Sequence, residues 1–163
     1  MGGPASEFKV ARCPTLLRRL HPAVLVALLE AVGGEIVMPV HPRTLARLAA
    51  HQLDARAANA ASLTPPLGYL DFAALLYHAK AVLTDSGGVQ KEAYLAGVPC
   101  VTLRERTEWT ETVTAGWNTL VSLNADAAVA ALARTPPAAR PALYGDGDAG
   151  TRIVAALEDY AAA

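Results

Sequence analysis

The most informative polar segment of this 163-residue sequence is Thr84-Asp85-Ser86-Gly87-Gly88-Val89-Gln90-Lys91-Glu92, which directly follows a short apolar run. Ser86 is a favourable helix N-cap, and Gly87 and Gly88 let a ligand approach the backbone because they carry no Cβ. Free N–H groups at the beginning of a helix favour a phosphate or diphosphate. Glu92 lies deeper in the same helix, where its carboxylate could accept hydrogen bonds from two adjacent hydroxyls, as on a ribose. The pattern equally fits an ordinary Ser-capped helix whose glycines allow tight packing against a strand.

A second candidate lies in Val40-His41-Pro42-Arg43-Thr44, which also follows an apolar run. The charge of a histidine changes near neutral pH and an arginine is a permanent cation, so His41 and Arg43 could together hold an anionic ligand. Lone histidines and arginines are common in turns. In isolation we favour an ordinary structural role, in which Arg43 pairs with a surface carboxylate and His41 caps a loop carbonyl.

The third polar segment is Leu103-Arg104-Glu105-Arg106-Thr107-Glu108-Trp109-Thr110-Glu111. Its carboxylates and arginines could form one polar wall of a cleft, and Thr107 or Thr110 could cap a short helix. For most of these side chains a solvated surface position is the better interpretation. Trp109 and Trp117 are expected to pack against other residues rather than to hold a cofactor.

Composition and motif content exclude several functions. A net charge of −1 and an aromatic content of 6% give no basis for binding nucleic acid by charge or by base stacking. Metal-ligand spacings, an HExxH motif and a Ser/His/Asp arrangement do not occur, so the sequence predicts no metal and no cofactor. The longest apolar run, residues 23–29, is too short to span a membrane. Cys13 and Cys100 form no disulfide framework, which favours a reducing, cytoplasmic location.

Short apolar strands alternate with amphipathic helices along most of the chain. The pattern predicts strands at residues 35–40, 61–63, 79–84, 99–103 and 119–122. It predicts helices at residues 22–32, 42–48, 69–78, 86–96, 110–115, 125–133 and 150–161. This alternation indicates a parallel sheet covered on both faces, which is a Rossmann-like, doubly wound α/β domain of residues 21–163. Residues 1–20 show no sustained period and are expected to be a poorly ordered leader outside this domain.

Five segments carry a more specific signal when they are taken together and in order. They are Val40-His41-Pro42-Arg43-Thr44, Gly68-Tyr69-Leu70-Asp71-Phe72, Leu83-Thr84-Asp85-Ser86-Gly87-Gly88-Val89-Gln90-Lys91-Glu92-Ala93, Thr107-Glu108 and Tyr144-Gly145-Asp146-Gly147. This set closely resembles the non-hydrolysing UDP-N-acetylglucosamine 2-epimerases over nearly all of residues 21–160. The resemblance implies the C-terminal half of a GT-B architecture, in which two Rossmann-like domains hold a UDP-sugar between them.

The resemblance also implies roles for individual residues. Ser86 and Gly87 would contact the diphosphate, and Glu92 would bind the ribose hydroxyls. The loop at Phe72 would meet uracil through backbone groups, and His41 lies where family members place a histidine near the nucleotide-sugar. The family reaction inverts C2 by eliminating UDP to give a 2-acetamidoglucal and then adding UDP back. The complete set of candidate substrate-binding residues is Ser86, Gly87, Gly88, Glu92, Phe72, His41 and Arg43.

The N-terminal part of the family pattern is missing from this sequence. The family's catalytic carboxylates lie in an N-terminal domain that is absent here, so no catalytic residue is assigned. A His-Arg-Arg-Glu-type segment expected just before His21 is also missing, and we expect one strand of the sheet to be missing with it. The exposed sheet edge would promote association. The expected partners are therefore a UDP-sugar, the absent N-terminal epimerase domain and a second copy in a homodimer.

A second departure concerns the sugar. Trp109-Thr110 stands where the common family pattern has Arg-Pro, and Ala115-Gly116-Trp117-Asn118 follows. This form is similar to members that act on UDP-2,3-diacetamido-2,3-dideoxy-glucuronate, so the sugar is left open. Elimination needs a base and an acid, and this chain offers no matching pair. The leading hypothesis is therefore the UDP-sugar-binding half of a 2-epimerase of cell-surface polysaccharide biosynthesis, inactive alone. The alternatives are a non-catalytic UDP-sugar-binding remnant or regulatory module, and the donor half of a GT-B glycosyltransferase, which the epimerase-like motifs disfavour.

Overall fold

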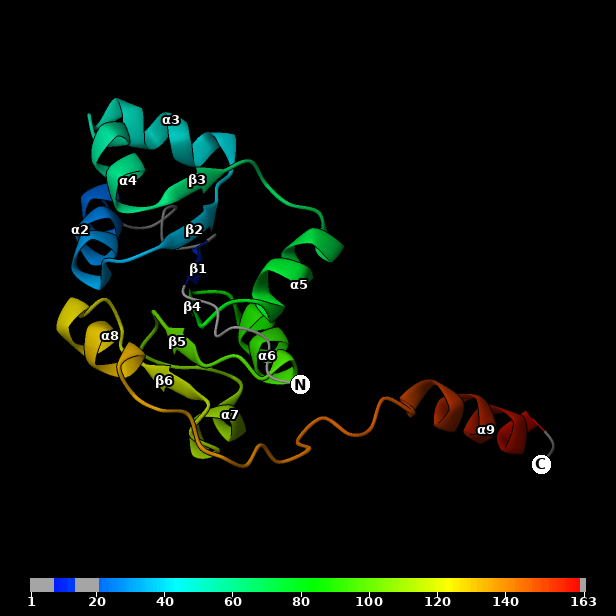
Figure 1. Cartoon of the computed structure of the whole chain (residues 1–163). Coiled ribbons are helices and arrows are strands. Elements are labelled where there is room, and N and C mark those ends of the chain that lie inside the picture. The colour runs from blue at the N-terminus through cyan, green and yellow to red at the C-terminus, as the bar shows by residue number, and fades with distance from the viewer. Residues whose placement is uncertain (1–7, 14–20, 162–163) are drawn as a thin grey trace.

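The structure, a computed structural model, describes residues 8–13 and 21–161. Within these residues, six parallel strands form one sheet (Figure 1). In chain order they are β1 (Lys9–Arg12), β2 (Ile36–Pro39), β3 (Ser62–Thr64), β4 (Ala81–Thr84), β5 (Cys100–Thr102) and β6 (Asn118–Leu120). Their spatial order is β3-β2-β1-β4-β5-β6. The chain therefore winds outward from β1 on one side and from β4 on the other, which confirms the predicted doubly wound, Rossmann-like α/β fold.

Helices follow the strands, and all except the last of them lie beside the sheet (Figure 1). They are α2 (Pro22–Val32), α3 (Pro42–Ala50), α4 (Asp54–Ala60), α5 (Tyr69–Tyr77), α6 (Gly87–Ala96), α7 (Thr110–Thr114), α8 (Ala125–Leu132) and α9 (Ala149–Ala161). The elements predicted from the sequence are confirmed to within a residue or two at their boundaries. The sequence pattern does not indicate α4, because this short, alanine-rich helix begins without a side-chain cap.

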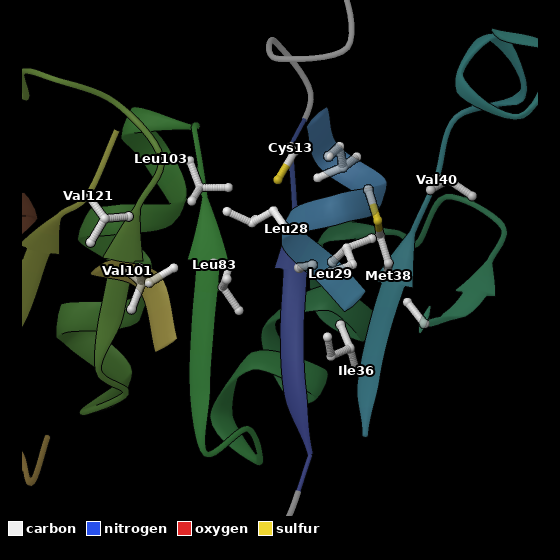
Figure 2. Packing of buried hydrophobic residues seen from close by; sticks show 14 residues of the cluster. Cys13, Leu28, Leu29, Ile36, Met38, Val40, Leu83, Val101, Leu103 and Val121 are labelled. Atoms are coloured by element: carbon white, nitrogen blue, oxygen red, sulfur yellow. The ribbon is translucent and has the colours of Figure 1, made fainter. Parts of the chain in front are cut away.

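Both faces of the central strands are buried, and successive residues point to opposite faces. Val10 and Val82 lie on the face covered by α5 and α6. Ala11 and Leu83 lie on the other face, against side chains of α2 and α8. Figure 2 shows this second cluster, in which α2 packs over the strands. Strands buried on both faces are apolar at most positions, which is why β4 and β5 appear in the sequence as almost uninterrupted apolar runs.

The expectation that one strand of the sheet is missing is wrong. Residues of the expected leader form β1, which pairs with β2 on one side and β4 on the other at the centre of the sheet. Val10 and Ala11 of this strand are fully buried, and the Lys9 ammonium donates a hydrogen bond to the Gly33 carbonyl at 2.9 Å. The sheet therefore has no gap at this position to promote the expected homodimer. The rest of the expected leader, residues 1–7 and 14–20, lies outside the described residues.

The last helix stands apart from the domain. Figure 1 shows α9 at the end of a long connection, and none of its described residues is buried. Ile153, Val154, Leu157 and Tyr160 are between 54% and 84% exposed. Their spacing places them on one side of the helix, so α9 presents an uncovered apolar stripe. Like every other helix in the described part of the chain, α9 is too short or too polar to cross a membrane.

Val10→Ala should lower the free energy of unfolding by about 2 kcal/mol, because it removes two methyl groups from a fully buried strand and leaves a cavity. Val24→Ala is the matched control. Val24 is 38% exposed on α2, so the same truncation should change stability by less than about 0.5 kcal/mol. Urea denaturation measures both values. Equal losses would contradict a buried β1.

Candidate functional site

The carboxyl ends of the parallel strands meet at one edge of the sheet, where the strand order reverses between β1 and β4. The buried hydroxyl of Thr84 joins these two strand ends. Its Oγ1 donates a hydrogen bond to the Arg12 carbonyl at 2.6 Å and accepts one from the Ser86 N–H at 3.1 Å. Both partners are backbone groups, so this bridge fixes the beginning of α6 beside the end of β1.

The start of α6 has the form predicted from the sequence. Ser86 is the N-cap and has extended backbone angles, although its side chain makes no capping hydrogen bond. The first N–H groups of a helix have no acceptor within the helix. Gly87 and Gly88 supply two of these groups without a side chain over them. Such a helix start favours an anion, through its free donors and through the helix dipole.

An anionic side chain of the protein already stands at this helix start. The Glu108 carboxylate lies against Gly87, so closely that a side chain at position 87 would collide with Oε1. The other carboxylate oxygen accepts a hydrogen bond from Arg104 at 3.2 Å, in an ion pair whose Glu108 side chain is 51% exposed. The close approach therefore requires a glycine at position 87. A bound anion would have to displace a carboxylate that is already half in solvent.

Glu92 and Phe72 lie on the neighbouring helices α6 and α5. Glu92 is partly buried in the second turn of α6, and no hydrogen bond or ion pair joins it to another described residue. Phe72 lies in the first turn of α5 rather than in a loop, with its buried ring 4.5 Å from the Arg12 guanidinium. Its N–H donates to the Gly68 carbonyl at 2.9 Å. The free backbone donors of this helix start therefore belong to residues 69–71.

His41 and Arg43 lie at the start of α3, just after β2. The Nδ1 atom of His41 accepts a hydrogen bond from the Arg43 N–H at 3.2 Å, so His41 is the N-cap of α3 and does not cap a loop carbonyl. This leaves Nε2 as the protonated nitrogen of the neutral ring. The surface ion pair expected for Arg43 is not formed with any described residue. Both side chains are exposed and available to a ligand.

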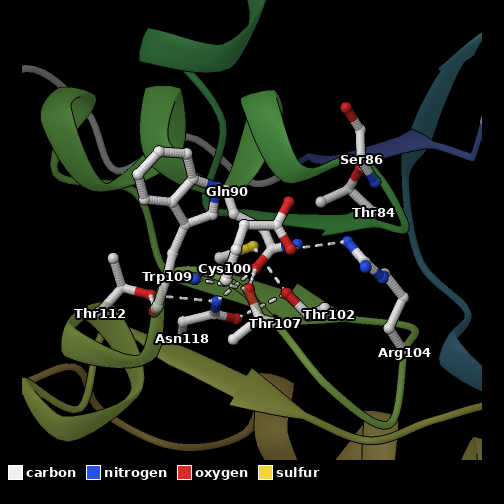
Figure 3. A network of polar contacts seen from close by, with 11 residues as sticks. Thr84, Ser86, Gln90, Cys100, Thr102, Arg104, Thr107, Trp109, Thr112 and Asn118 are labelled. Atoms are coloured by element: carbon white, nitrogen blue, oxygen red, sulfur yellow. Dashed lines mark hydrogen bonds and ion pairs between the residues drawn. The ribbon is translucent and has the colours of Figure 1, made fainter.

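A buried polar network supports the segment that carries Glu108 (Figure 3). The Oε1 atom of Gln90 accepts hydrogen bonds from Thr107 Oγ1 at 2.6 Å and from Asn118 Nδ2 at 3.0 Å. The Oδ1 atom of Asn118 accepts one from Thr102 Oγ1 at 2.7 Å. The Thr107 hydroxyl oxygen also accepts the Trp109 N–H at 3.1 Å. The network therefore joins α6, β5 and β6 to residues 107–109 and sets the distance between that segment and α6.

Aromatic residues surround a lysine on α6. The Lys91 Nζ atom lies 5.0 Å from the centre of the Trp109 ring and 4.6 Å from that of Tyr144. The Tyr144 hydroxyl donates a hydrogen bond to Glu111 Oε1 at 2.8 Å. Burial and this acceptor raise the pKa of Tyr144 above its usual value, while the pKa of Glu111 is lowered by its own N–H and by Tyr144. These contacts attach the C-terminal connection to α6 and α7.

The thiols have no chemical role in this arrangement. Cys13 and Cys100 are free and buried. Burial raises the pKa of both thiols, and the Asp85 carboxylate raises that of Cys13 further. Thiols with a raised pKa are poor nucleophiles. In the part of the chain that the structure describes, no group of three or more His, Cys, Asp or Glu side chains could hold a metal ion.

Comparison with known proteins decides the family. The sequence model of the UDP-N-acetylglucosamine 2-epimerase family matches residues 19–158. The chain belongs to this family. A UDP-N-acetylglucosamine 2-epimerase homolog of Methanococcus maripaludis is 44% identical over 140 residues, which cover 83% of this chain and 39% of the relative. The UDP-2,3-diacetamido-2,3-dideoxy-D-glucuronate 2-epimerase of Pseudomonas aeruginosa is 40% identical over 142 residues, covering 81% of this chain and 39% of the relative.

Solved structures of 2-epimerases share the fold of this chain. The UDP-GlcNAc 2-epimerase of Methanocaldococcus jannaschii matches with a TM-score of 0.79 and 32% identity, over 94% of this chain and 46% of that one. The same enzyme in complex with UDP-GlcNAc and UDP matches with a TM-score of 0.75 and 32% identity, over 93% and 45%. The predicted resemblance is thus confirmed, and the chain spans less than half the length of these relatives.

In this 2-epimerase family member, sequence reasoning located the helix start but not its surroundings. The structure brings Ser86, Gly87 and Gly88 together and places Glu92 on the same helix, whereas the remaining candidates lie at the starts of α3 and α5. Sequence analysis missed the contact of Glu108 with Gly87. A glycine pair at a helix start indicates that a ligand or another part of the chain approaches the helix backbone closely. The sequence pattern does not show which residue of the chain does so.

Thr107→Val should lower the free energy of unfolding by about 1–3 kcal/mol, because it keeps the side-chain shape but removes a donor to Gln90 and the acceptor of the Trp109 N–H. Thr114→Val is the control, since the exposed Thr114 hydroxyl donates to the Thr110 carbonyl where water can replace it. This change should cost less than about 0.5 kcal/mol. Urea denaturation that gave the two variants the same stability would contradict a supporting role for the network.

Proposed function

We propose that this chain is the UDP-sugar-binding half of a 2-epimerase that interconverts C2 epimers by eliminating UDP and adding it back. Family membership supports the reaction class, and a matching structure is described as a complex with UDP-GlcNAc and UDP. The observation that carries the proposal for this chain is the start of α6. There a glycine without a side chain lies at the reversal of strand order, with a carboxylate already against it. A helix start that accommodates a carboxylate can accommodate a diphosphate.

In this proposal, α6 binds both the diphosphate and the ribose. The N–H groups of Gly87 and Gly88 bind the diphosphate oxygens, and the Ser86 hydroxyl, which makes no capping hydrogen bond, contacts them as well. Glu92 lies in the second turn, away from the phosphate charge, and has no hydrogen-bond partner among the described residues. A free carboxylate can accept hydrogen bonds from both ribose hydroxyls at once. One helix would therefore fix the nucleotide at two points.

The starts of α5 and α3 supply the rest of the proposed site. Because the Phe72 N–H is engaged within α5, uracil would meet the free backbone donors of residues 69–71, with the buried Phe72 ring supporting them. His41 would offer its Nε2 proton and Arg43 its permanent charge to the nucleotide-sugar from the end of β2.

The chemistry itself would require a second domain. Elimination needs a base at C2 and an acid at the leaving group, and the one carboxylate among the candidate residues, Glu92, is assigned to the ribose. The matching relatives are about twice as long as this chain. The uncovered apolar stripe of α9 is suited to contact with another protein surface. An N-terminal epimerase domain is therefore the proposed partner, and the chain alone should bind UDP without turnover.

The proposal covers UDP-activated 2-acetamido sugars as a class, since relatives are named for UDP-N-acetylglucosamine and for UDP-2,3-diacetamido-2,3-dideoxy-D-glucuronate. We place the reaction in cell-surface polysaccharide biosynthesis and in the cytoplasm, where free, buried cysteines stay reduced. A calicheamicin glycosyltransferase matches with a TM-score of 0.52 and 16% identity, which shows a common fold alone. A non-catalytic UDP-sugar-binding module would use the same residues as the half-enzyme.

Glu92→Gln should weaken UDP binding by about 1.5–3 kcal/mol, the usual contribution of hydrogen bonds to a charged group. Glu158→Gln makes the same change at an exposed position of α9 and should leave the affinity unaltered. Isothermal titration calorimetry measures both. If the Glu92 variant bound UDP as tightly as the parent protein, Glu92 would not lie at the ribose.

The 163-residue protein alone should release no UDP from UDP-GlcNAc, whereas a mixture with a separately expressed N-terminal epimerase domain should invert C2, as followed by NMR. Leu157→Ser on the apolar stripe should lower the activity of a dilute mixture by about tenfold or more, because it removes apolar contact area from the proposed interface.

Ala155→Ser, on the opposite side of α9, is the control and should leave the mixture active. Turnover by the chain alone would overturn the half-enzyme proposal. A mixture that binds UDP but gives no inversion would favour the non-catalytic module.

A further inference from the structure

Two side-chain polar groups in the segment of residues 103–109 border the start of α6. Neither of them has a role in the proposed function. One is the Glu108 carboxylate and the other is the Trp109 indole nitrogen. Both lie at the space that a side chain on Gly87 would occupy, and Trp109 Nε1 is 3.5 Å from the Cβ position of such a side chain. A ligand bound to the free N–H groups of this helix start would therefore meet both groups.

Within residues 8–13 and 21–161, the indole N–H of Trp109 has no hydrogen-bond partner. Its Nε1 atom is buried and makes no hydrogen bond to any described residue. Leaving a buried donor unsatisfied is destabilising, so native structures satisfy nearly all of them. A bound ligand that supplied an acceptor would remove this cost. An unsatisfied donor beside a candidate anion site thus points to a ligand oxygen.

The position of the ring is well determined by other contacts. The ring packs nearly at right angles to the Tyr144 ring with the ring centroids 5.9 Å apart, and the Lys91 ammonium lies 5.0 Å from its centre. The Trp109 backbone N–H is held by the Thr107 hydroxyl. Figure 3 shows the indole extending toward α6, which carries Gln90, and not away from it. The donor is therefore held in place beside Gly87 before any ligand binds.

We infer that the Trp109 indole N–H is an additional ligand-binding donor at the diphosphate position, and that Glu108 occupies this position until the ligand displaces it. The inference rests on the proposed function and identifies residues of the same site. A diphosphate oxygen would replace the Glu108 carboxylate at the helix start and accept a hydrogen bond from Nε1 in addition to those from the backbone. The displaced carboxylate is half exposed and can remain paired with Arg104 in solvent.

This arrangement distinguishes phosphorylated ligands from uridine itself. Uridine has no anionic group to compete with Glu108 and no phosphate oxygen for Nε1. The two residues should therefore affect UDP affinity in opposite directions and leave uridine affinity unchanged. Removing the donor weakens UDP binding, whereas removing the competing charge strengthens it.

The first test observes the donor directly. The chain has two tryptophans, so a 15N-labelled sample gives two indole N–H signals. The Trp117 indole already donates to the Ala139 carbonyl at 3.1 Å and serves as the internal control. Saturating UDP should move the Trp109 signal downfield, as expected for a new hydrogen bond to an anionic acceptor. The Trp117 signal should stay in place, and uridine should move neither.

The second test measures affinity by calorimetry. Trp109→Phe keeps an aromatic ring against Lys91 and Tyr144 but removes the N–H, and it should weaken UDP binding by about tenfold. Glu108→Gln removes the competing charge and should tighten UDP binding by about threefold or more. Neither variant should change the affinity for uridine.

The outcomes separate this inference from the proposed function. Parent protein that binds UDP, with a Trp109→Phe variant of equal affinity and a Trp109 signal that does not move, would overturn the inference and leave the proposed function intact. Weaker UDP binding by Glu108→Gln would also overturn it, because Glu108 would then help to hold the ligand. Failure of the parent protein to bind UDP would remove the proposed function and this inference with it. If Trp109→Phe did not fold, the indole signal of the parent protein would still show whether the Trp109 N–H binds UDP.

Discussion

The hydroxyl of Thr84 is the contact on which the position of the site depends. It donates to the Arg12 carbonyl of β1 and accepts from the backbone N–H of Ser86, so it ties the middle of the sheet to the start of α6. Both central strands are buried on both faces, which leaves this junction little freedom to shift. The free N–H groups of α6 consequently occur at the reversal of strand order, where an open parallel sheet binds its ligands.

Most of the fold could be predicted because strands buried on both faces are almost uninterrupted apolar runs, each followed by a helix with a recognisable start. The same reasoning explains the two elements that were missed. In β1, Val10 and Ala11 lie between the charged Lys9 and Arg12, so the run is too short to be recognised, and the strand is defined by pairing with two neighbours. In helix α4 the buried residue is Ala57, so its sequence favours a helix by composition but lacks the apolar spacing by which the other helices were predicted.

The features of the site that could be predicted are those set by residues adjacent in the sequence. Contacts between segments that are distant in the sequence could not be predicted. Ser-Gly-Gly after an apolar strand has a direct physical meaning, and the structure forms the helix start accordingly. The contact between Gly87 and Glu108 depends on the position of residues 103–109 after β5, and on the buried hydrogen bonds of Gln90 that hold them. The charge pattern predicted that most side chains of residues 103–111 are solvated, and the Glu108 side chain is 51% exposed in its ion pair with Arg104. The pattern could not indicate that the other oxygen of the same carboxylate reaches across to α6.

Nucleotide binding and C2 inversion place different demands on a fold. Backbone donors at a helix start are fixed by one helix and one sheet edge, and α6 supplies them without any other domain. C2 inversion needs in addition an acid and a base at the sugar, and the candidate residues of this chain do not include such a pair. The exposed stripe of α9, carried away from the sheet edge by a long connection, is a surface on which a second domain could be positioned. Because the binding groups of the proposed site are already in place without that domain, binding and turnover are expected to be separable in this chain.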